Sequence, residues 1–331
     1  MASFAWGLMV VIGVKPITGF ADDLLDGARF DDQSSAYSVR HSPDYPRSRL
    51  APVLSFFLPG LDQWLEGQHG HALGYSLTAV AGLSLLSDTA QESEDGSDGE
   101  FQQDQFGVSE SQKRFMWGNQ LFVGAGGMSA YHAFRTMVKT QQTHGKYGFL
   151  TLKEQPADIL MAPFKFSYLK RSTTWIPLAV AGWLHLSVMM ADSETLAEQG
   201  AQITALTGSD VFYTGAISYG AGVWEEAAFR GWILPEFMQL THSPDWSNAI
   251  TALLFSLAHL NTVSVPWIQL GLGWYFGDLT IRNNWEIGES VFIHSWWDVF
   301  AFLTVFRLEQ KDALPQSASR PVYLPALEWR F

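Results

Sequence analysis

The sequence contains no cysteine. This excludes disulfide bridges, thiolate nucleophiles and cysteine-based zinc or iron–sulfur sites. Charged residues are also scarce, at 16% of the 331 residues, against about 25% in an average soluble domain. The 20 Lys and Arg are outnumbered by 33 Asp and Glu, which gives a net charge of −13. Because neutralising phosphates requires clustered basic side chains, we expect no nucleic-acid partner.

Aromatic residues are abundant: they make up 14% of the chain and include 14 tryptophans. This composition is typical of a protein that lies partly in lipid, where Trp and Tyr gather at the interfaces. The mean hydropathy is only +0.02, because apolar blocks and very polar connectors cancel. The mean hydropathy of the whole chain therefore says little about its individual segments.

The first 21 residues contain a short apolar run, Ala5 to Val14, and a small-residue exit at Ala21. This resembles a secretory signal peptide. No Lys or Arg precedes the run, so a signal cleaved near Ala21, an uncleaved anchor and a misplaced start all stay open. Residues 22–49 are polar and are predicted to be an exposed lead-in.

Apolar blocks follow from Leu50 onward. The first block, Leu50–Leu65, is interrupted by Pro59-Gly60, which predicts a broken or re-entrant helix whose freed backbone groups need partners within the protein. Further blocks have about the length that a helix needs to cross hydrocarbon. They lie at 70–87, 115–136, 173–191, 208–226, 247–263, 265–281 and 288–306. The sequence therefore predicts an all-α fold, a polytopic transmembrane helical bundle with about eight membrane segments.

The charged segments between the apolar blocks predict how the chain is oriented in the membrane. Residues 88–114, between the N-terminal membrane segments (50–136), form an acidic loop, whereas residues 137–172 are basic. The positive-inside rule makes the basic loop cytoplasmic and the acidic loop external. Within the basic loop, residues 157–171 mix apolar and basic side chains, as in a segment lying along a membrane surface. We expect a multi-pass protein of the bacterial inner membrane, ending in a C-terminal tail at 307–331.

Ionisable side chains inside apolar segments are costly, and they usually face a protein interior and serve a function. Glu225, Glu226 and Arg230 stand in one such segment. Glu226 and Arg230 are four residues apart and can pair on one helix face. Glu225 points about 100° away from that face, so it is not used up by the ion pair.

Two later segments repeat the four-residue spacing, with Phe255 and His259 in one and His294 and Asp298 in the other. A glutamate in a low-dielectric pocket can act as a general base on water, and an imidazole beside it can hold that water. A second imidazole with its helical neighbour can donate hydrogen bonds to an oxyanion. Spacing and burial alone thus suggest a hydrolytic site.

The sequences EEAAFR (225–230), FSLAH (255–259) and HSWWD (294–298) resemble the EExxxR, FxxxH and HxxxN motifs of the CPBP family, the intramembrane CAAX proteases and bacteriocin-processing (Abi) endopeptidases. The resemblance covers about residues 173–306. It implies that Glu225 activates water, that His259 orients it, and that Glu226 and Arg230 brace the helix, with Phe255 as a further supporting residue. It places His294 in the oxyanion site and departs at Asp298, where the family usually has Asn.

An ionised Asp298 cannot donate to an oxyanion, so it must be protonated, must orient His294 instead, or the site is impaired. The resemblance implies no cofactor, although Glu225, His259 and His294 could in principle hold zinc. No HExxH motif is present, which excludes a zincin. Asp278, in the sequence YFGD, with Asp298 would be the pair of an intramembrane aspartyl protease, but this leaves Glu225 unexplained.

The predicted function is an intramembrane endopeptidase that acts on a protein or peptide substrate at a lipid bilayer. Prenylated CAAX ends, bacteriocin precursors and membrane-anchored regulators are all compatible with the resemblance. The alternative is a non-catalytic transporter or scaffold derived from the same fold, and the departure at Asp298 keeps it open.

Overall fold

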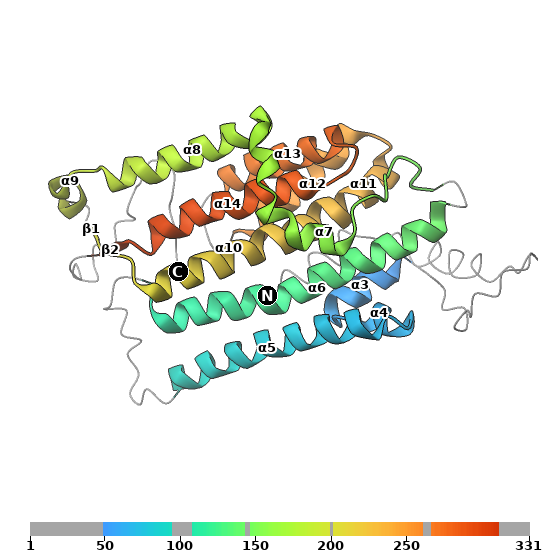
Figure 1. The fold of residues 1–331 in the computed structure, drawn as a ribbon, viewed down its shortest axis with the longest axis horizontal. Coiled ribbons are helices and arrows are strands. Elements are labelled where there is room, and N and C mark those ends of the chain that lie inside the picture. Colours follow the sequence, from blue (N-terminus) through green and yellow to red (C-terminus); the bar gives the residue numbers. More distant parts are fainter. Residues whose placement is uncertain (1–48, 95–107, 143–145, 199–200, 261–265, 311–331) are drawn as a thin grey trace, which may run out of the picture.

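The computed structural model describes residues 49–94, 108–142, 146–198, 201–260 and 266–310, and most of them lie in helices (Figure 1). The all-α prediction is confirmed. In the described residues the only sheet pairs β1 (Ala201–Ile203) with β2 (Leu308–Gln310) in antiparallel register. The predicted signal segment, nearly all of the polar lead-in, most of the acidic loop and most of the C-terminal tail lie outside the described residues.

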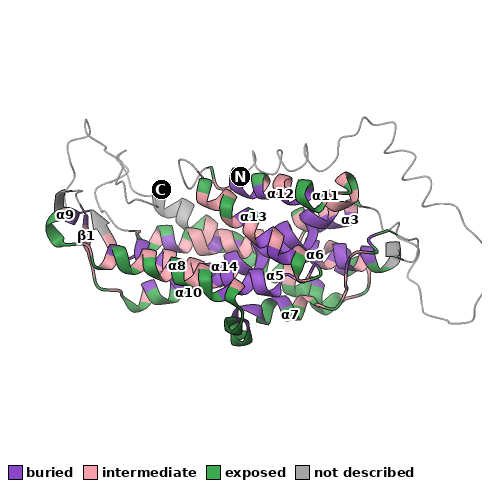
Figure 2. Ribbon diagram, turned by 90° about the horizontal axis from the view of Figure 1, so that it is seen from above, coloured by how far each residue is buried: buried purple, intermediate pink, exposed green. Residues whose placement is uncertain are grey.

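Five long helices lie side by side in one row (Figure 1). In order across the row they are α5 (His69–Glu94), α6 (Glu110–Gln142), α10 (Gly208–Ala228), α14 (Gly288–Val305) and α8 (Ser172–Met189). Shorter helices pack on one side of the row (Figure 2), namely α3 (Leu50–Phe57), α11 (Leu234–Thr241), α12 (Pro244–Ala258) and α13 (Trp267–Arg282), while the short α4 (Leu61–Leu65) contacts α3, α5 and α6. Figure 2 shows buried residues concentrated in the middle of the assembly.

An α-helix lies over each apolar block predicted from the sequence. Both α5 and α6 run further than predicted, into the ends of the acidic segment 88–114, because Ala, Gln and Glu there are good helix formers. Within the parts of the chain that the structure describes, no helix combines enough length and apolarity to cross a membrane.

The helix break predicted at Pro59-Gly60 separates α3 from α4. Gly60 has a φ of 94°, a left-handed conformation that glycine adopts without strain. The freed backbone groups find partners on neighbouring helices, as the prediction required. The Gly60 N–H donates to Ser129 Oγ at 2.9 Å, and the Ser76 hydroxyl donates to the Pro59 carbonyl at 2.8 Å. The backbone at the break is therefore hydrogen-bonded to both α5 and α6.

The helix that carries the two glutamates is defined at both ends by local sequence. Thr207 Oγ1 caps α10 by accepting the Asp210 N–H, and the Asp210 carboxylate accepts the Thr207 N–H in return, which satisfies two orphan donors. At the other end α10 continues into η3 (Phe229–Ile233), a π-helical turn in which the Leu234 N–H bonds to the Phe229 carbonyl. Pro235 follows and has no N–H to offer the preceding turn, which explains the widened geometry.

The basic segment 146–171, which we call the strap, crosses α10 and α14. It contains α7 (Pro156–Met161) and the 3₁₀ turns η1 (Ala162–Phe164) and η2 (Phe166–Lys170). Glu154 accepts the backbone N–H groups of Ile287 and Gly288 at 2.6 and 2.9 Å and so caps the start of α14. Burial raises the pKa of Glu154, while these two hydrogen bonds oppose the rise. The strap is thus tied to the first turn of α14.

Candidate active site

Glu225 and Glu226 lie in the last turn of α10, and both are buried. As neighbours on a helix they point about 100° apart. Glu226 Oε1 accepts a hydrogen bond from Arg230 Nη1 at 2.8 Å, and both side chains are 0% exposed. The ion pair expected from the four-residue spacing is therefore present, and Glu225 stays outside it.

Arg230 makes further contacts besides its ion pair with Glu226. Its Nη2 donates to the Gly273 carbonyl of α13 at 3.0 Å, and its guanidinium lies 4.4 Å from the Phe255 ring centroid and 5.3 Å from that of Phe276. Cation–π contacts of this kind strengthen when water is excluded. Arg230 consequently links α10 to α12 and α13 and fixes the position of Glu226.

His294 faces carboxylates on both sides of its ring. Its Nδ1 lies 2.9 Å from Glu226 Oε1, and since a carboxylate only accepts, Nδ1 is the donor. Its Nε2 lies 3.8 Å from Glu225 Oε2 and 3.7 Å from Asp298 Oδ2. The ring also stacks on Phe276 with centroids 5.3 Å apart. His294 is thereby held with Nε2 turned toward Glu225.

His259 follows the last residue of α12, and its Nδ1 lies 2.7 Å from the Phe255 carbonyl. A carbonyl oxygen can only accept, so the proton is on Nδ1 and Nε2 is directed away from the helix. That Nε2 lies 3.7 Å from Glu225 Oε2. The ring contact expected between Phe255 and His259 is present, with centroids 4.7 Å apart.

Glu225 Oε2 therefore faces both imidazoles, yet it has no hydrogen-bond partner among the described residues. The exposure of the four side chains shows where the cluster opens. Glu225 and His294 are 9% and 6% exposed, whereas His259 and Asp298 are 23% and 20% exposed. A substrate can approach from the side of His259 and Asp298, toward a carboxylate that lies deeper.

A close approach between α10 and α14 sets this geometry. A Cβ at Gly222 would overlap Ser295 Oγ and would lie 2.6 Å from Ser295 N, so only glycine fits there. Gly222 precedes Glu225 by one turn and Ser295 follows His294. The contact fixes how closely the two reactive side chains come together.

The remaining sequence hypotheses for the site fare differently. In the described ranges no three His, Asp or Glu side chains are grouped so that they could hold a metal ion. Asp278, the partner required for an aspartyl dyad, pairs instead with Arg282 at 2.9 Å, while Asp298 faces His294. Asp278 and Asp298 thus have separate partners and do not form the pair that an aspartyl protease needs.

Sequence reasoning missed three features of the site: the stacking of Phe276 on His294, the Gly222–Ser295 contact and the π-turn. Phe276 lies in the segment GLGWYFGDL, and glycines spaced in this way are a sequence signal for a close contact between helices. Pro235 was a signal for an irregular turn, because its missing N–H disturbs the preceding helical turn. The Gly222 contact left no comparable signal, since glycine is also common in loosely packed helices.

The family comparison covers this site. Residues 207–300 match the family model described as "Type II CAAX prenyl endopeptidase Rce1-like". The matched region holds all three motifs and nearly all of α10 to α14, and it confirms the family resemblance over this part of the chain. Neither the curated proteins nor the solved structures include a match.

Proposed function

We propose that the region around α10, α12 and α14 is an endopeptidase that hydrolyses a peptide bond with water activated by Glu225. The observation that carries the proposal is the position of Glu225 Oε2, which is buried, has no hydrogen-bond partner among the described residues and lies within 3.7–3.8 Å of both imidazole Nε2 atoms. The family match, which is to a protease family, supports hydrolysis.

In the proposed reaction, a water molecule lies between Glu225 and His259. The carboxylate takes a proton from it, and Nε2 of His259, which carries no proton, accepts the other hydrogen and holds the oxygen in place. The oxygen attacks the scissile carbonyl, and Glu225 then passes its proton to the leaving amine. Glu225 is the general base and general acid, and His259 is the orienting group.

The oxyanion formed by this attack needs donors in a site that excludes water. His294 Nδ1 is committed to Glu226, so its Nε2 is the donor available when the ring carries both protons. Asp298 adds a second donor when its carboxyl is protonated, and its partial exposure at the rim gives it access to the substrate. Glu226 and Arg230 act as positioning residues through His294.

We propose a membrane location as well, supported by the outward faces of the helices. Large apolar side chains are exposed along α8, from Trp175 and Ile176 to Trp183 and Leu186, and along α5, from Leu73 to Leu83. Exposed apolar patches of this extent mark membrane or protein contacts. Together with the family match, they favour a substrate that is a membrane-associated protein or peptide, and a prenylated C-terminal peptide is the first to test.

The decisive experiment compares wild type with Glu225→Gln in detergent, using a panel of internally quenched peptides with and without a prenylated cysteine. Glutamine keeps the shape but cannot accept the proton, so kcat should fall by about 10²- to 10⁴-fold. Glu236→Gln is the matched control. Glu236 is largely shielded, with 13% of its side chain exposed, and it accepts the Tyr147 hydroxyl at 2.9 Å, a bond that glutamine can keep.

Full activity of Glu225→Gln, with the control also active, would contradict the role of Glu225. Peptide binding without cleavage by the wild type across the panel would favour the non-catalytic transporter or scaffold. Thermal unfolding of each variant shows whether a loss of activity has a structural cause.

A further inference from the structure

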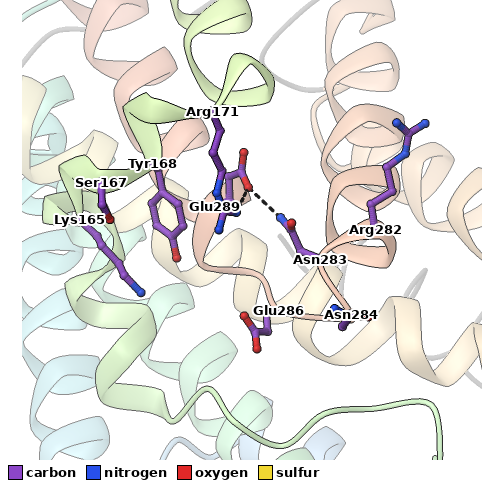
Figure 3. A pocket seen from close by; sticks show the side chains of 9 residues that line it. All are labelled: Lys165, Ser167, Tyr168, Arg171, Arg282, Asn283, Asn284, Glu286 and Glu289. Atoms are coloured by element: carbon purple, nitrogen blue, oxygen red, sulfur yellow. Dashed lines mark hydrogen bonds and ion pairs between the residues drawn. The ribbon is translucent and has the colours of Figure 1, made fainter.

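We call Glu225, Glu226, His259, His294 and Asp298 the glutamate cluster. A second polar site lies away from it. A cavity of about 320 Å³ opens between the strap and the turn that joins α13 to α14. Figure 3 shows the strap residues on one side and the turn residues opposite them. Its lining includes three basic side chains, Lys165, Arg171 and Arg282, and none of the residues of the glutamate cluster.

Two acidic side chains, Glu286 and Glu289, also line the cavity, so its lining carries one net positive charge. Glu289 is buried and is satisfied by four donors, Arg171, Thr173, Thr174 and Asn283, so its charge is compensated locally. Arg282 pairs with Asp278 at the outer edge and is 72% exposed. Lys165 lies over the Tyr168 ring at 5.3 Å, and within the described part of the chain it has no carboxylate partner.

Neutral donors in the cavity complete a site for an anion. Burial raises the pKa of Tyr168 to about 12, so its hydroxyl keeps its proton and can donate. Ser167 and Asn284 add a further hydroxyl and an amide. Charge-assisted hydrogen bonds from lysine and arginine to phosphate are among the stronger polar contacts in proteins.

The strap beside the cavity exposes an unusual density of large apolar side chains. Leu160, Met161, Phe164, Phe166 and Leu169 are all exposed although they lie within ten residues. Lys165, Lys170 and Arg171 alternate with them. Exposed apolar side chains beside basic ones fit the interface of an anionic membrane, where acyl chains and phosphate groups lie a few ångströms apart.

We propose that this cavity binds the phosphate head group of an anionic phospholipid whose acyl chains lie along the exposed apolar side chains of the strap. The size of the cavity suits a single head group, and Lys165, together with the neighbouring Lys170 of the strap, favours an anionic lipid over a zwitterionic one. The strap also contacts the helices of the glutamate cluster. Trp296, two residues after His294, donates to the Pro163 carbonyl at 3.0 Å, and Tyr219 donates to the Leu160 carbonyl at 3.1 Å. A bound lipid would therefore stabilise the strap against α10 and α14, whether or not the chain is a protease.

The test titrates the purified full chain in a neutral detergent and follows its thermal unfolding by tryptophan fluorescence. Dioleoyl phosphatidylglycerol should raise Tm saturably, because a ligand that binds only the folded state stabilises it. Dioleoyl phosphatidylcholine has the same chains without net charge, and glycerol 3-phosphate has the phosphate without chains. Neither should reproduce the rise at the same concentration.

Paired variants locate the site. Lys165→Gln with Arg282→Gln removes two exposed charges that line the cavity and should weaken phosphatidylglycerol binding by at least about tenfold. The control, Lys139→Gln with Lys153→Gln, removes the same charge from exposed positions that do not line it and should shift binding by less than about twofold.

Three results would overturn the proposal. Equal stabilisation by phosphatidylcholine would show apolar adsorption alone. Equal stabilisation by glycerol 3-phosphate would show a small-anion site without a lipid. An equal loss in the control pair would show diffuse electrostatic attraction with no role for the cavity.

Discussion

His294 Nδ1 and Arg230 Nη1 donate to the same oxygen, Glu226 Oε1, at 2.9 and 2.8 Å. One buried carboxylate atom thus joins the helix of the first motif to the helix of the third. Glu226 is fully buried, so both hydrogen bonds form in a medium of low dielectric, where they are strong and costly to break. The second glutamate of the EExxxR motif orients an imidazole as well as pairing with the arginine.

Replacing Glu226 by Gln should destabilise the fold severely. It leaves the Arg230 guanidinium buried without a counter-charge, which typically costs about 3–5 kcal/mol. Thermal unfolding in detergent measures this as a fall in Tm. The double variant Glu226→Gln with Arg230→Met removes the stranded charge and should recover part of the loss, while Glu194→Gln, at an exposed position, should have almost no effect. A Tm for Glu226→Gln equal to that of wild type would show that the pair contributes little to stability.

Replacing Asp298 by Asn should preserve peptide cleavage to within about tenfold. The reason is that Glu226, and not Asp298, holds the short hydrogen bond to His294, and an amide N–H can donate to an oxyanion without first taking up a proton. Asp298→Leu offers no donor and should lose activity. The measurement is kcat for both variants on the same reporter peptide. If Asn abolishes turnover while Leu retains it, Asp298 has another role.

Adding one methyl group at Gly222 should separate α10 from α14. The new Cβ would overlap Ser295, so Gly222→Ala should lower stability by about 1–3 kcal/mol and should reduce activity further by moving Glu225 away from His294. Gly215→Ala on the same helix meets no atom within 4 Å and should stabilise the helix by about 0.5–1 kcal/mol. Thermal unfolding and kcat of the two variants decide the point, and an equal response of both would show that the contact has no special role.

The proposed membrane location predicts how the chain behaves when cells are fractionated. The full chain should sediment with membranes and stay there after washing with alkaline carbonate, because exposed apolar faces such as that of α8 hold it by hydrophobic contact. A neutral detergent should release it. Release by carbonate or by high salt alone would contradict the proposal and would point to a peripheral, charge-based association.

Much of the architecture followed from local patterns. The apolar blocks predicted where helices lie, and Pro59-Gly60 predicted a break, since both depend on residues close together in the chain. The four-residue spacings predicted which side chains share a helix face, and the Glu226–Arg230 pair and the Phe255–His259 contact are present.

Contacts between helices distant in sequence were harder to predict from the sequence. That Glu226 would bind His294, 68 residues away, depends on how α10 and α14 cross, and no local pattern encodes this. The helix ends near the acidic segment were also misplaced, because charged residues suggested a loop although several of them are good helix formers. Membrane crossing was inferred from apolar blocks whose helices do not combine the required length and apolarity in the described residues.

The π-turn at Phe229–Ile233 has a consequence for how this chain can vary. A π-turn accommodates one residue more than the α-helical turn it replaces, and each residue rotates a helix by about 100°. Loss of a single residue there would rotate α11 about the helix axis relative to Glu225, and loss of Phe229 would also shorten the spacing between Glu226 and Arg230 from four residues to three. The fold can tolerate single substitutions on either side of the π-turn, whereas the number of residues between the glutamate pair and α11 cannot change.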